Sequence, residues 1–226
     1  LKQKLMTRRY ALMQSTLQRF LLTISLLLGS FSTLAQPIAK DEYSVSPLLN
    51  GEQIPAITLQ DMNGQNVDLA KLTAQKPTIF FFYRGGWCPF CNNQMGQLKA
   101  IEPKLIEMGF QLVGISPDTP ALLKASAAKN ELKYLLLSDE KMLASQAFGL
   151  AFYTSKQVTE TYLSRLKLDN PLWTTPEGDK RLVLPVPAIY IADTQGLIHF
   201  QYVNPNYKVR PAPKLILTAA SLVGAP

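Results

Sequence analysis

One stretch of the chain, residues 78–91, constrains the fold more than any other. It begins with Thr78-Ile79-Phe80-Phe81-Phe82-Tyr83, a continuous β-branched and aromatic run that predicts a strand buried on both faces. Gly85-Gly86 ends this strand, and Cys88-Pro89-Phe90-Cys91 follows. Beyond the second cysteine, apolar residues recur at helical spacing, namely Met95, Leu98, Ile101 and Leu105. The sequence therefore predicts a strand, a short loop and a helix, with both cysteines at the start of the helix.

The position of the cysteine pair favours chemical reactivity over a structural role. Unpaired N–H groups and the positive end of the helix dipole stabilise a thiolate at a helix start, which lowers the cysteine pKa. Pro89 is tolerated there because the first turn offers no partner for its N–H. Cys88 and Cys91 are the only two cysteines, and a bridge between them closes too short a loop to stabilise the fold much. A zinc site needs four ligands, and the chain adds only His199. We interpret the pair as redox-active, with no cofactor.

Residues 1–35 have the pattern of a secretory signal peptide. They contain five basic and no acidic residues, an apolar run from Phe20 to Leu28, and Thr33-Leu34-Ala35 as a cleavage site. We expect cleavage near Ala35 and a bacterial periplasmic or secreted protein; an uncleaved signal anchor is the alternative. Without this segment 18 basic and 16 acidic residues remain, so the net charge falls from +7 to +2. We therefore expect no nucleic-acid partner, and membrane contact only through an uncleaved signal.

The remainder of the chain reads as a flexible lead-in over residues 36–50 and one domain over residues 51–226. Strands and helices alternate along this domain, which predicts an α/β fold with a largely parallel sheet. The helix after the cysteine pair should end near Gly109, with a kink or a break at Pro103. Residues 151–183 interrupt the alternation with an extra helix over 157–168, which forms either a lid over the site or plain packing. Further strands are predicted at 56–60, 66–69, 111–116, 135–137, 186–193 and 197–200, and further helices at 120–129, 140–148 and 212–223.

Several of these segments together resemble a known family. They are Phe82 to Cys91, Leu112-Val113-Gly114-Ile115-Ser116-Pro117-Asp118, the run from Val186 to Gly196, and Asn204-Pro205-Asn206-Tyr207. Over residues 51–222 the chain resembles the thioredoxin-like superfamily, and within it the alkyl hydroperoxide reductase/thiol-specific antioxidant branch of peroxiredoxin-like redoxins. The resemblance implies a thioredoxin-like fold, with a central mixed sheet flanked by helices, an N-terminal extension and an inserted helical segment.

The resemblance implies, as the first hypothesis, a thiol–disulfide oxidoreductase. In this reading Cys88 is the exposed attacking thiolate and Cys91 resolves the mixed disulfide. Pro187, in the cis form, faces the pair and leaves the backbone of Val186 free to bind an incoming peptide. Residues of the substrate groove, or residues that tune the thiolate, are Arg84, Trp87, Pro89, Phe90, Val186 and Pro187. The partners are protein or small-molecule thiols and disulfides, with a thiol as electron donor.

The second hypothesis is a thiol peroxidase that acts on peroxides. Aligned on Phe82-Tyr83, the peroxidatic position is Cys91, and Cys88 resolves the sulfenic acid. The supporting residues of a peroxiredoxin are missing, because its Thr, Pro and Arg positions hold Cys88, Arg84 and a site at or next to Pro187. The third hypothesis is a non-catalytic partner-binding domain with a vestigial cysteine pair.

Overall fold

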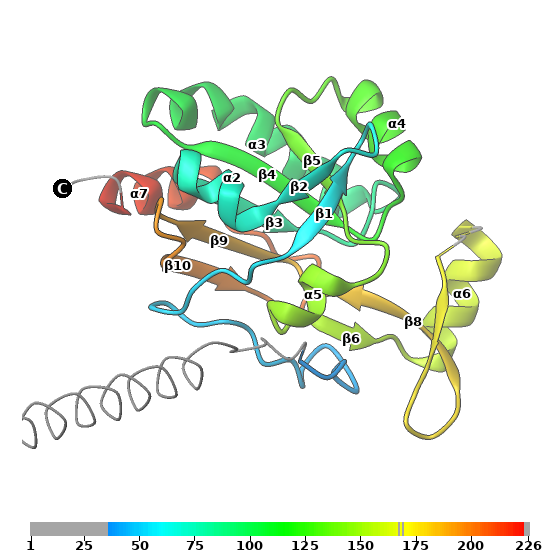
Figure 1. Cartoon of the computed structure of the whole chain (residues 1–226). Helices are drawn as coiled ribbons and strands as arrows, with labels where there is room; N and C mark the ends of the chain where they lie inside the picture. The colour runs from blue at the N-terminus through cyan, green and yellow to red at the C-terminus, as the bar shows by residue number, and fades with distance from the viewer. Residues whose placement is uncertain (1–35, 167, 169, 224–226) are drawn as a thin grey trace, which may run out of the picture. The chain divides into compact units, whose positions relative to one another are not determined.

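Figure 1 shows the computed structural model, which describes residues 36–166, 168 and 170–223. The proposed signal segment lies outside the described residues. A seven-stranded sheet, with the order β10-β9-β3-β4-β5-β1-β2, forms the centre. Its strands are β1 (Thr58–Asp61), β2 (Asn66–Asp68), β3 (Thr78–Phe82), β4 (Gln111–Ser116), β5 (Leu135–Ser138), β9 (Ala188–Ala192) and β10 (Ile198–Val203).

The sheet is mixed, as the thioredoxin-like resemblance implies, and not largely parallel. Only β3 with β4 and β4 with β5 pair in parallel. The pairs β1–β2, β1–β5, β3–β9 and β9–β10 are antiparallel. Two of the antiparallel pairs, β1–β2 and β9–β10, are hairpins in which no helical crossover intervenes. The other two, β1–β5 and β3–β9, join strands that are distant in sequence, so periodicity does not indicate their direction.

Strand β3 lies in the interior of the sheet, as its uninterrupted apolar sequence predicts. All five of its residues are buried, and the sheet continues on both sides of it. Ile79 and Phe81 point to one face, and Phe80 and Phe82 point to the other. The first face is covered by α3 (Pro89–Glu107), α4 (Pro120–Asn130) and α7 (Pro213–Val223), and the second by α2 (Leu69–Gln75) and α5 (Leu143–Ala147).

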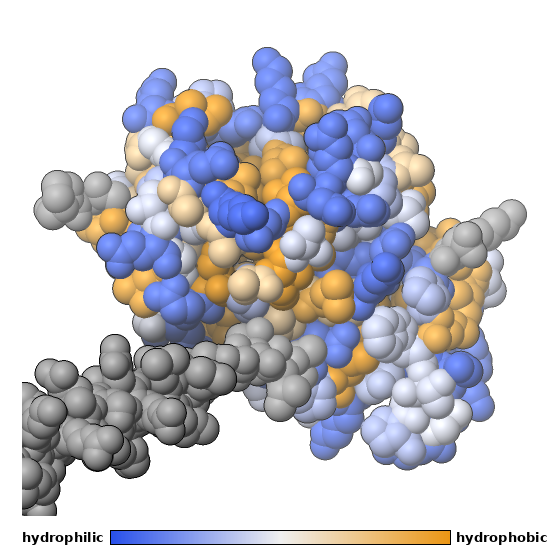
Figure 2. Space-filling model, in the orientation of Figure 1, coloured by the Kyte–Doolittle hydropathy of each residue, from blue (hydrophilic) through white to orange (hydrophobic). Residues whose placement is uncertain are grey.

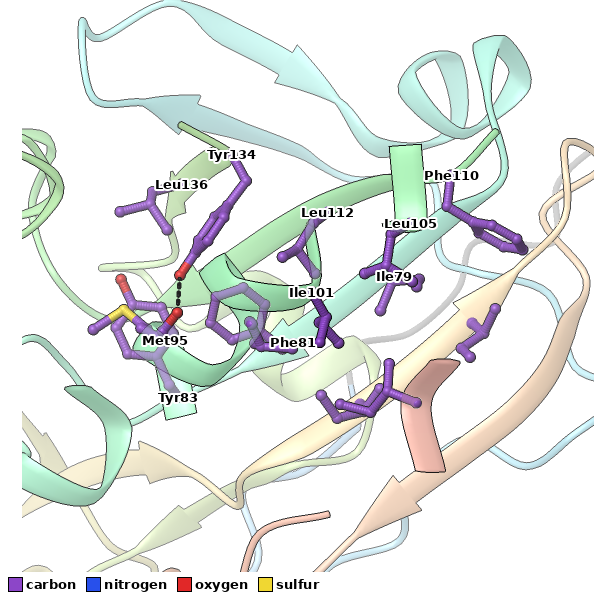
Figure 3. Packing of buried hydrophobic residues seen from close by; sticks show 14 of the residues in the cluster. Ile79, Phe81, Tyr83, Met95, Ile101, Leu105, Phe110, Leu112, Tyr134 and Leu136 are labelled. Carbon is purple, nitrogen blue, oxygen red and sulfur yellow. Dashed lines mark hydrogen bonds between the residues drawn. The ribbon is translucent and has the colours of Figure 1, made fainter. Parts of the chain in front are cut away.

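Helix α3 packs its apolar face against this sheet (Figure 3). Its buried positions include Met95, Leu98, Ile101 and Leu105, the residues that predicted the helix. Tyr134 donates a hydrogen bond of 3.1 Å to the carbonyl of Met95 and so fixes the helix near its middle. The predicted break at Pro103 is wrong, because α3 continues through it to Glu107. Pro103 removes one N–H donor, but the buried side chains on either side of it hold the helix to the sheet.

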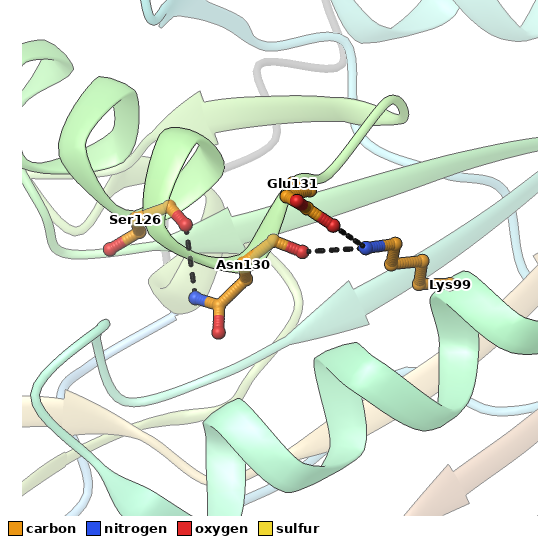
Figure 4. Close-up of polar contacts among 4 residues, drawn as sticks. All are labelled: Lys99, Ser126, Asn130 and Glu131. Carbon is orange, nitrogen blue, oxygen red and sulfur yellow. Dashed lines mark hydrogen bonds and ion pairs between the residues drawn. The ribbon is translucent and has the colours of Figure 1, made fainter.

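A polar cluster joins α3 to the end of α4 (Figure 4). Lys99 donates to the carbonyl of Asn130 at 3.1 Å and to the carboxylate of Glu131 at 3.0 Å. Asn130 in turn donates to the carbonyl of Ser126, 2.9 Å away, within α4. The bond from Lys99 satisfies the carbonyl of Asn130, which has no partner within the helix because it lies at the end of α4. Within the described ranges no helix is long and apolar enough to cross a membrane.

The insertion forms a second, three-stranded sheet together with a helix. The sheet has the order β6-β8-β7, and its strands are β6 (Ala151–Tyr153), β7 (Leu172–Thr174) and β8 (Lys180–Pro185). Helix α6 (Lys156–Leu166) is the helix expected at 157–168, whereas β6 and β7 were not anticipated. Figure 2 shows a hydrophobic patch over α6, where Leu166 is 41% exposed.

The segment 36–50, for which we expected a flexible lead-in, makes regular backbone hydrogen bonds to this second sheet and its neighbourhood. Ala39 donates to the carbonyl of Ala151 and accepts from the N–H of Tyr153, both at 2.9 Å. Leu48 donates to the carbonyl of Phe148 at 3.2 Å. These bonds add a short bridge beside β6 that hydrophobic periodicity does not reveal.

Candidate active site

The loop between β3 and α3 positions the cysteine pair. Gly86 donates its backbone N–H to the buried carboxylate of Asp118 at 2.8 Å, and the Asn92 side chain donates to the Gly86 carbonyl at 2.9 Å. Gly85 has φ +136°, a conformation that favours glycine, and a Cβ there would lie 2.9 Å from the Asp118 carboxylate. A Cβ on Gly86 would overlap the Ser126 hydroxyl. Both glycines are therefore needed for the loop to pass between β4 and α4.

The two cysteines occupy the first turn of α3, as predicted. Cys88 is the N-cap residue, with φ −85° and ψ 117°, and Pro89 follows inside the helix. The thiol of Cys91, aided by its backbone N–H and by the charges of Arg84 and Arg210, lowers the pKa of Cys88 to about 6 despite burial. The same interaction with Cys88, together with burial, raises the pKa of Cys91. The pair therefore carries one readily lost proton, and the opposite directions of the two pKa shifts favour Cys88 as the thiolate.

Two arginines lie beside this pair, and sequence reasoning singled out only one of them. Arg84 is 4% exposed, and its Nη2 donates to the hydroxyl of Tyr162 at 2.8 Å. Arg210 is the residue that was missed: its Nη2 lies 3.5 Å from the Sγ of Cys91. The two residues are 119 positions apart, so no local spacing could reveal the contact. The peroxidase hypothesis noted that the arginine of a peroxiredoxin is missing at or next to Pro187. A positive charge is instead supplied by Arg210, in the segment before α7.

Aromatic side chains enclose the site. The guanidinium of Arg84 lies 4.0 Å from the ring centroid of Tyr207 and 5.4 Å from that of Trp87. Tyr162 of α6 packs on Trp87 with 5.1 Å between centroids, so the inserted helix contacts the residue directly before Cys88. The expectation that Cys88 is exposed is wrong, because only 1% of this residue is exposed. Pro89 and Phe90 are the exposed residues of the motif, and Phe90 is 37% exposed.

The expected peptide-binding backbone at Val186 is not free. Val186 is fully buried and donates its N–H to the carbonyl of Leu150 at 2.9 Å. The Val186–Pro187 bond is trans, contrary to the expected cis form, since the described residues contain no cis peptide bond. Strand β8 ends at Pro185, directly before Val186. The fold itself therefore uses the backbone group that the oxidoreductase hypothesis assigned to an incoming peptide.

The arrangement supports two-electron chemistry at sulfur. A buried thiolate, a neighbouring thiol and two guanidinium groups can attack an electrophile and then close a disulfide. Across the residues that the structure covers, no three His, Cys, Asp or Glu side chains gather as metal ligands.

Comparison with known sequences places this chain in a defined family. The model of the AhpC/TSA family matches residues 50–201. Chloroplastic peroxiredoxin Q from Suaeda salsa is 34% identical over 126 residues, which are 54% of this chain and 58% of that protein. Peroxiredoxin Bcp from Escherichia coli is 32% identical over 106 residues, 47% of this chain and 67% of that protein. The chain thus spans about half to two thirds of the length of these curated relatives.

Solved structures agree on the fold. Reduced Prx3 from Vibrio vulnificus, in complex with hydrogen peroxide, has a TM-score of 0.62 and 17% identity, over 77% of this chain and 96% of that one. Peroxidoxin BcpB from Mycobacterium tuberculosis has a TM-score of 0.59 and 18% identity, over 77% and 97%. At these identities the likeness establishes the fold, and the predicted thioredoxin-like architecture is confirmed.

Proposed function

Since the chain belongs to the AhpC/TSA family, we propose that it is a thiol-dependent peroxidase built on the Cys88–Cys91 dithiol. The observation that carries this proposal is the convergence of Arg84 and Arg210 on the cysteine pair. Positive charge there stabilises the attacking thiolate and the oxygen anion that leaves when a peroxide bond breaks. The family supports the substrate class, and the lowered pKa of Cys88 beside the raised pKa of Cys91 supports the roles proposed for the two cysteines.

The reaction begins at Cys88, in contrast to the order in the peroxidase hypothesis from sequence. The Cys88 thiolate attacks one peroxide oxygen, an S–O bond forms, the O–O bond breaks, and the leaving alkoxide or hydroxide takes a proton. The Cys91 sulfur then attacks the sulfur of the sulfenic acid, forming the disulfide and releasing water. Two external thiols reduce this disulfide and become a disulfide themselves.

The second candidate function is thiol–disulfide exchange with the same nucleophile. The observation that favours it is Trp87-Cys88-Pro89-Phe90-Cys91, with the first cysteine as the thiolate. Against a protein substrate stands Val186, whose N–H is already used within the fold. Disulfide exchange is therefore proposed for small thiols, where it serves as the reducing half of the peroxidase cycle.

We expect peroxide reduction to depend on pH through the Cys88 thiolate. A pKa lowered to about 6 means that Cys88 is deprotonated at neutral pH, so the rate should rise through pH 6 and then level off. An ordinary thiol would titrate near ~8.5. The measurement is the second-order rate constant for hydrogen peroxide against pH, beside the ultraviolet absorbance of the thiolate.

Two variants of Arg210 separate the effect of its charge from the effect of its shape on the pH dependence. Arg210→Gln should move the midpoint to higher pH, because a positive charge that favours the thiolate is lost. Arg210→Lys keeps the charge and should keep the midpoint closer to that of the unchanged protein. If the pH–rate profile of the unchanged protein has its midpoint near the pKa of an ordinary thiol, the assignment of Cys88 as the attacking thiolate is contradicted.

We also propose a periplasmic or secreted location, with cleavage of the signal near Ala35 and a domain over residues 51–226. The support is the basic and then apolar composition of residues 1–35. A cysteine pair that cycles between dithiol and disulfide is compatible with such a compartment, provided that a thiol donor reaches it.

A further inference from the structure

A cavity lies next to Arg84, on the side covered by the insertion, and the charge of Arg84 acts on the Cys88 thiolate. Its volume is about 150 Å³, which suits a small molecule or the head group of a larger one. Arg84, Tyr162, Tyr207 and Pro187 are among its lining residues, and Val158 of α6 contributes to the opposite wall. The remaining lining residues are Glu42, Phe152, Thr154, Ser155 and Pro205. Arg84 supplies the basic group of this lining, and Glu42 supplies the acidic one.

The guanidinium of Arg84 has unused hydrogen-bonding capacity. Its Nη2 donates to Tyr162, whereas Nε and Nη1 are buried and have no hydrogen-bond partner in the described part of the chain. The side chain is 4% exposed, so bulk water does not satisfy these donors either. A buried guanidinium without an anionic partner is costly, and a carboxylate is the group that fits its planar donors best. The cavity is therefore suited to a carboxylate.

The redox state of the cysteine pair decides when Arg84 is free to bind such a ligand. In the reduced state the Cys88 thiolate shares the charge of Arg84. In the disulfide state Cys88 carries no charge, so the cation lacks this counter-charge. Because binding equilibria are reciprocal, a carboxylate should bind more tightly to the disulfide form than to the thiolate form. A ligand that prefers the oxidised form is expected to be the reductant.

We propose that this cavity binds the carboxylate of a small thiol that reduces the Cys88–Cys91 disulfide, with an α-amino-acid head group between Arg84 and Glu42. This inference rests on the proposed dithiol cycle. The bound thiolate attacks the Cys88 sulfur, an S–S bond forms, and the Cys91 sulfur leaves and takes a proton. A second thiolate attacks the mixed disulfide, releasing the small-molecule disulfide and the Cys88 thiolate. Arg210, beside Cys91, stabilises the leaving sulfur anion.

Four thiols test the head group one charge at a time. L-cysteine has a carboxylate and an ammonium group, 3-mercaptopropionate only the carboxylate, cysteamine only the ammonium group, and 2-mercaptoethanol neither. The disulfide form is prepared with diamide, so the test does not depend on peroxide reactivity. We expect L-cysteine to reduce it at least ~10-fold faster than cysteamine, at equal thiolate concentration, which corresponds to about 1.4 kcal/mol. 3-Mercaptopropionate should exceed 2-mercaptoethanol by a similar factor.

A matched pair of variants locates the effect in the cavity. Val158→Glu places a second carboxylate in the lining and should abolish the preference for carboxylate thiols. Gln157→Glu adds the same charge one residue earlier, at an exposed position outside the lining, and should preserve the preference. Propionate should raise the melting temperature of the disulfide form more than that of the dithiol form.

The proposal fails if the four thiols react at equal rates per thiolate, if none of them reduces the disulfide, or if the two variants behave alike. A protein that reduces its disulfide with the expected preference but ignores hydrogen peroxide would contradict the peroxidase proposal and leave this one standing.

Discussion

Replacing Cys88 with serine should abolish turnover of peroxide, with a loss of at least ~1,000-fold in rate constant. Cys88 is the sulfur whose pKa is lowered, so its loss removes the thiolate that attacks. Serine keeps the size of the side chain and the N-cap position, and the fold should be retained. Peroxide consumption and the circular dichroism spectrum of the variant check the two halves of this expectation.

The matched variant at the second cysteine should behave differently. Cys91→Ser keeps the attacking thiolate but removes the sulfur that closes the disulfide, so one equivalent of peroxide should be consumed per chain. The sulfenic acid on Cys88 should then be trapped by dimedone and seen as a mass increase on the peptide that contains Cys88. The reverse result, with Cys91→Ser inert and Cys88→Ser oxidised at Cys91, would instead support Cys91 as the peroxidatic residue.

Truncating Phe81 should produce a large loss of stability, because its ring lies at the centre of the core. The side chain is fully buried, stacks on Tyr83 at 5.5 Å and meets Tyr134 edge-on at 5.6 Å (Figure 3). Gly114 leaves the space that the ring fills, since a Cβ there would lie 2.5 Å from the ring. Phe81→Ala should therefore lower the free energy of unfolding by about 3–5 kcal/mol.

The control is the same substitution at a partly exposed position. Phe90 is 37% exposed and contacts Tyr207 with 5.7 Å between centroids, so Phe90→Ala should cost less than about 1.5 kcal/mol. Urea unfolding followed by tryptophan fluorescence measures both values. Equal losses for the two variants would contradict the role of β3 as the interior strand around which the core is built.

The central unit of the fold could be predicted because its signals are local. Three signals follow one another directly in the sequence. They are the continuous apolar run of β3, the glycine pair, and the helical spacing of apolar residues after Cys91. The antiparallel pair β9–β10 and the helix α7 were predicted for the same reason. Cys88 at the N-terminus of a helix followed directly from this order of elements.

The closure of the site could not be predicted, because it depends on contacts between distant segments. Arg210 reaches Cys91 across 119 positions, and Tyr162 reaches Arg84 across 78. Strands β6 and β7 are three residues each, too short for an alternating pattern. The hydrogen bond from the N–H of Val186 to the carbonyl of Leu150 could not be predicted either, because the two residues are distant in sequence. These contacts turn an expected open groove into a small enclosed site.

The most direct test of the central claim is a single-turnover titration of the reduced protein with hydrogen peroxide, read by intact mass. We expect one equivalent of peroxide to convert the chain within seconds to a form two hydrogens lighter, with Cys88 and Cys91 joined in one disulfide. A reduced protein whose mass is unchanged after this treatment, while diamide still forms the disulfide, would contradict the peroxidase proposal.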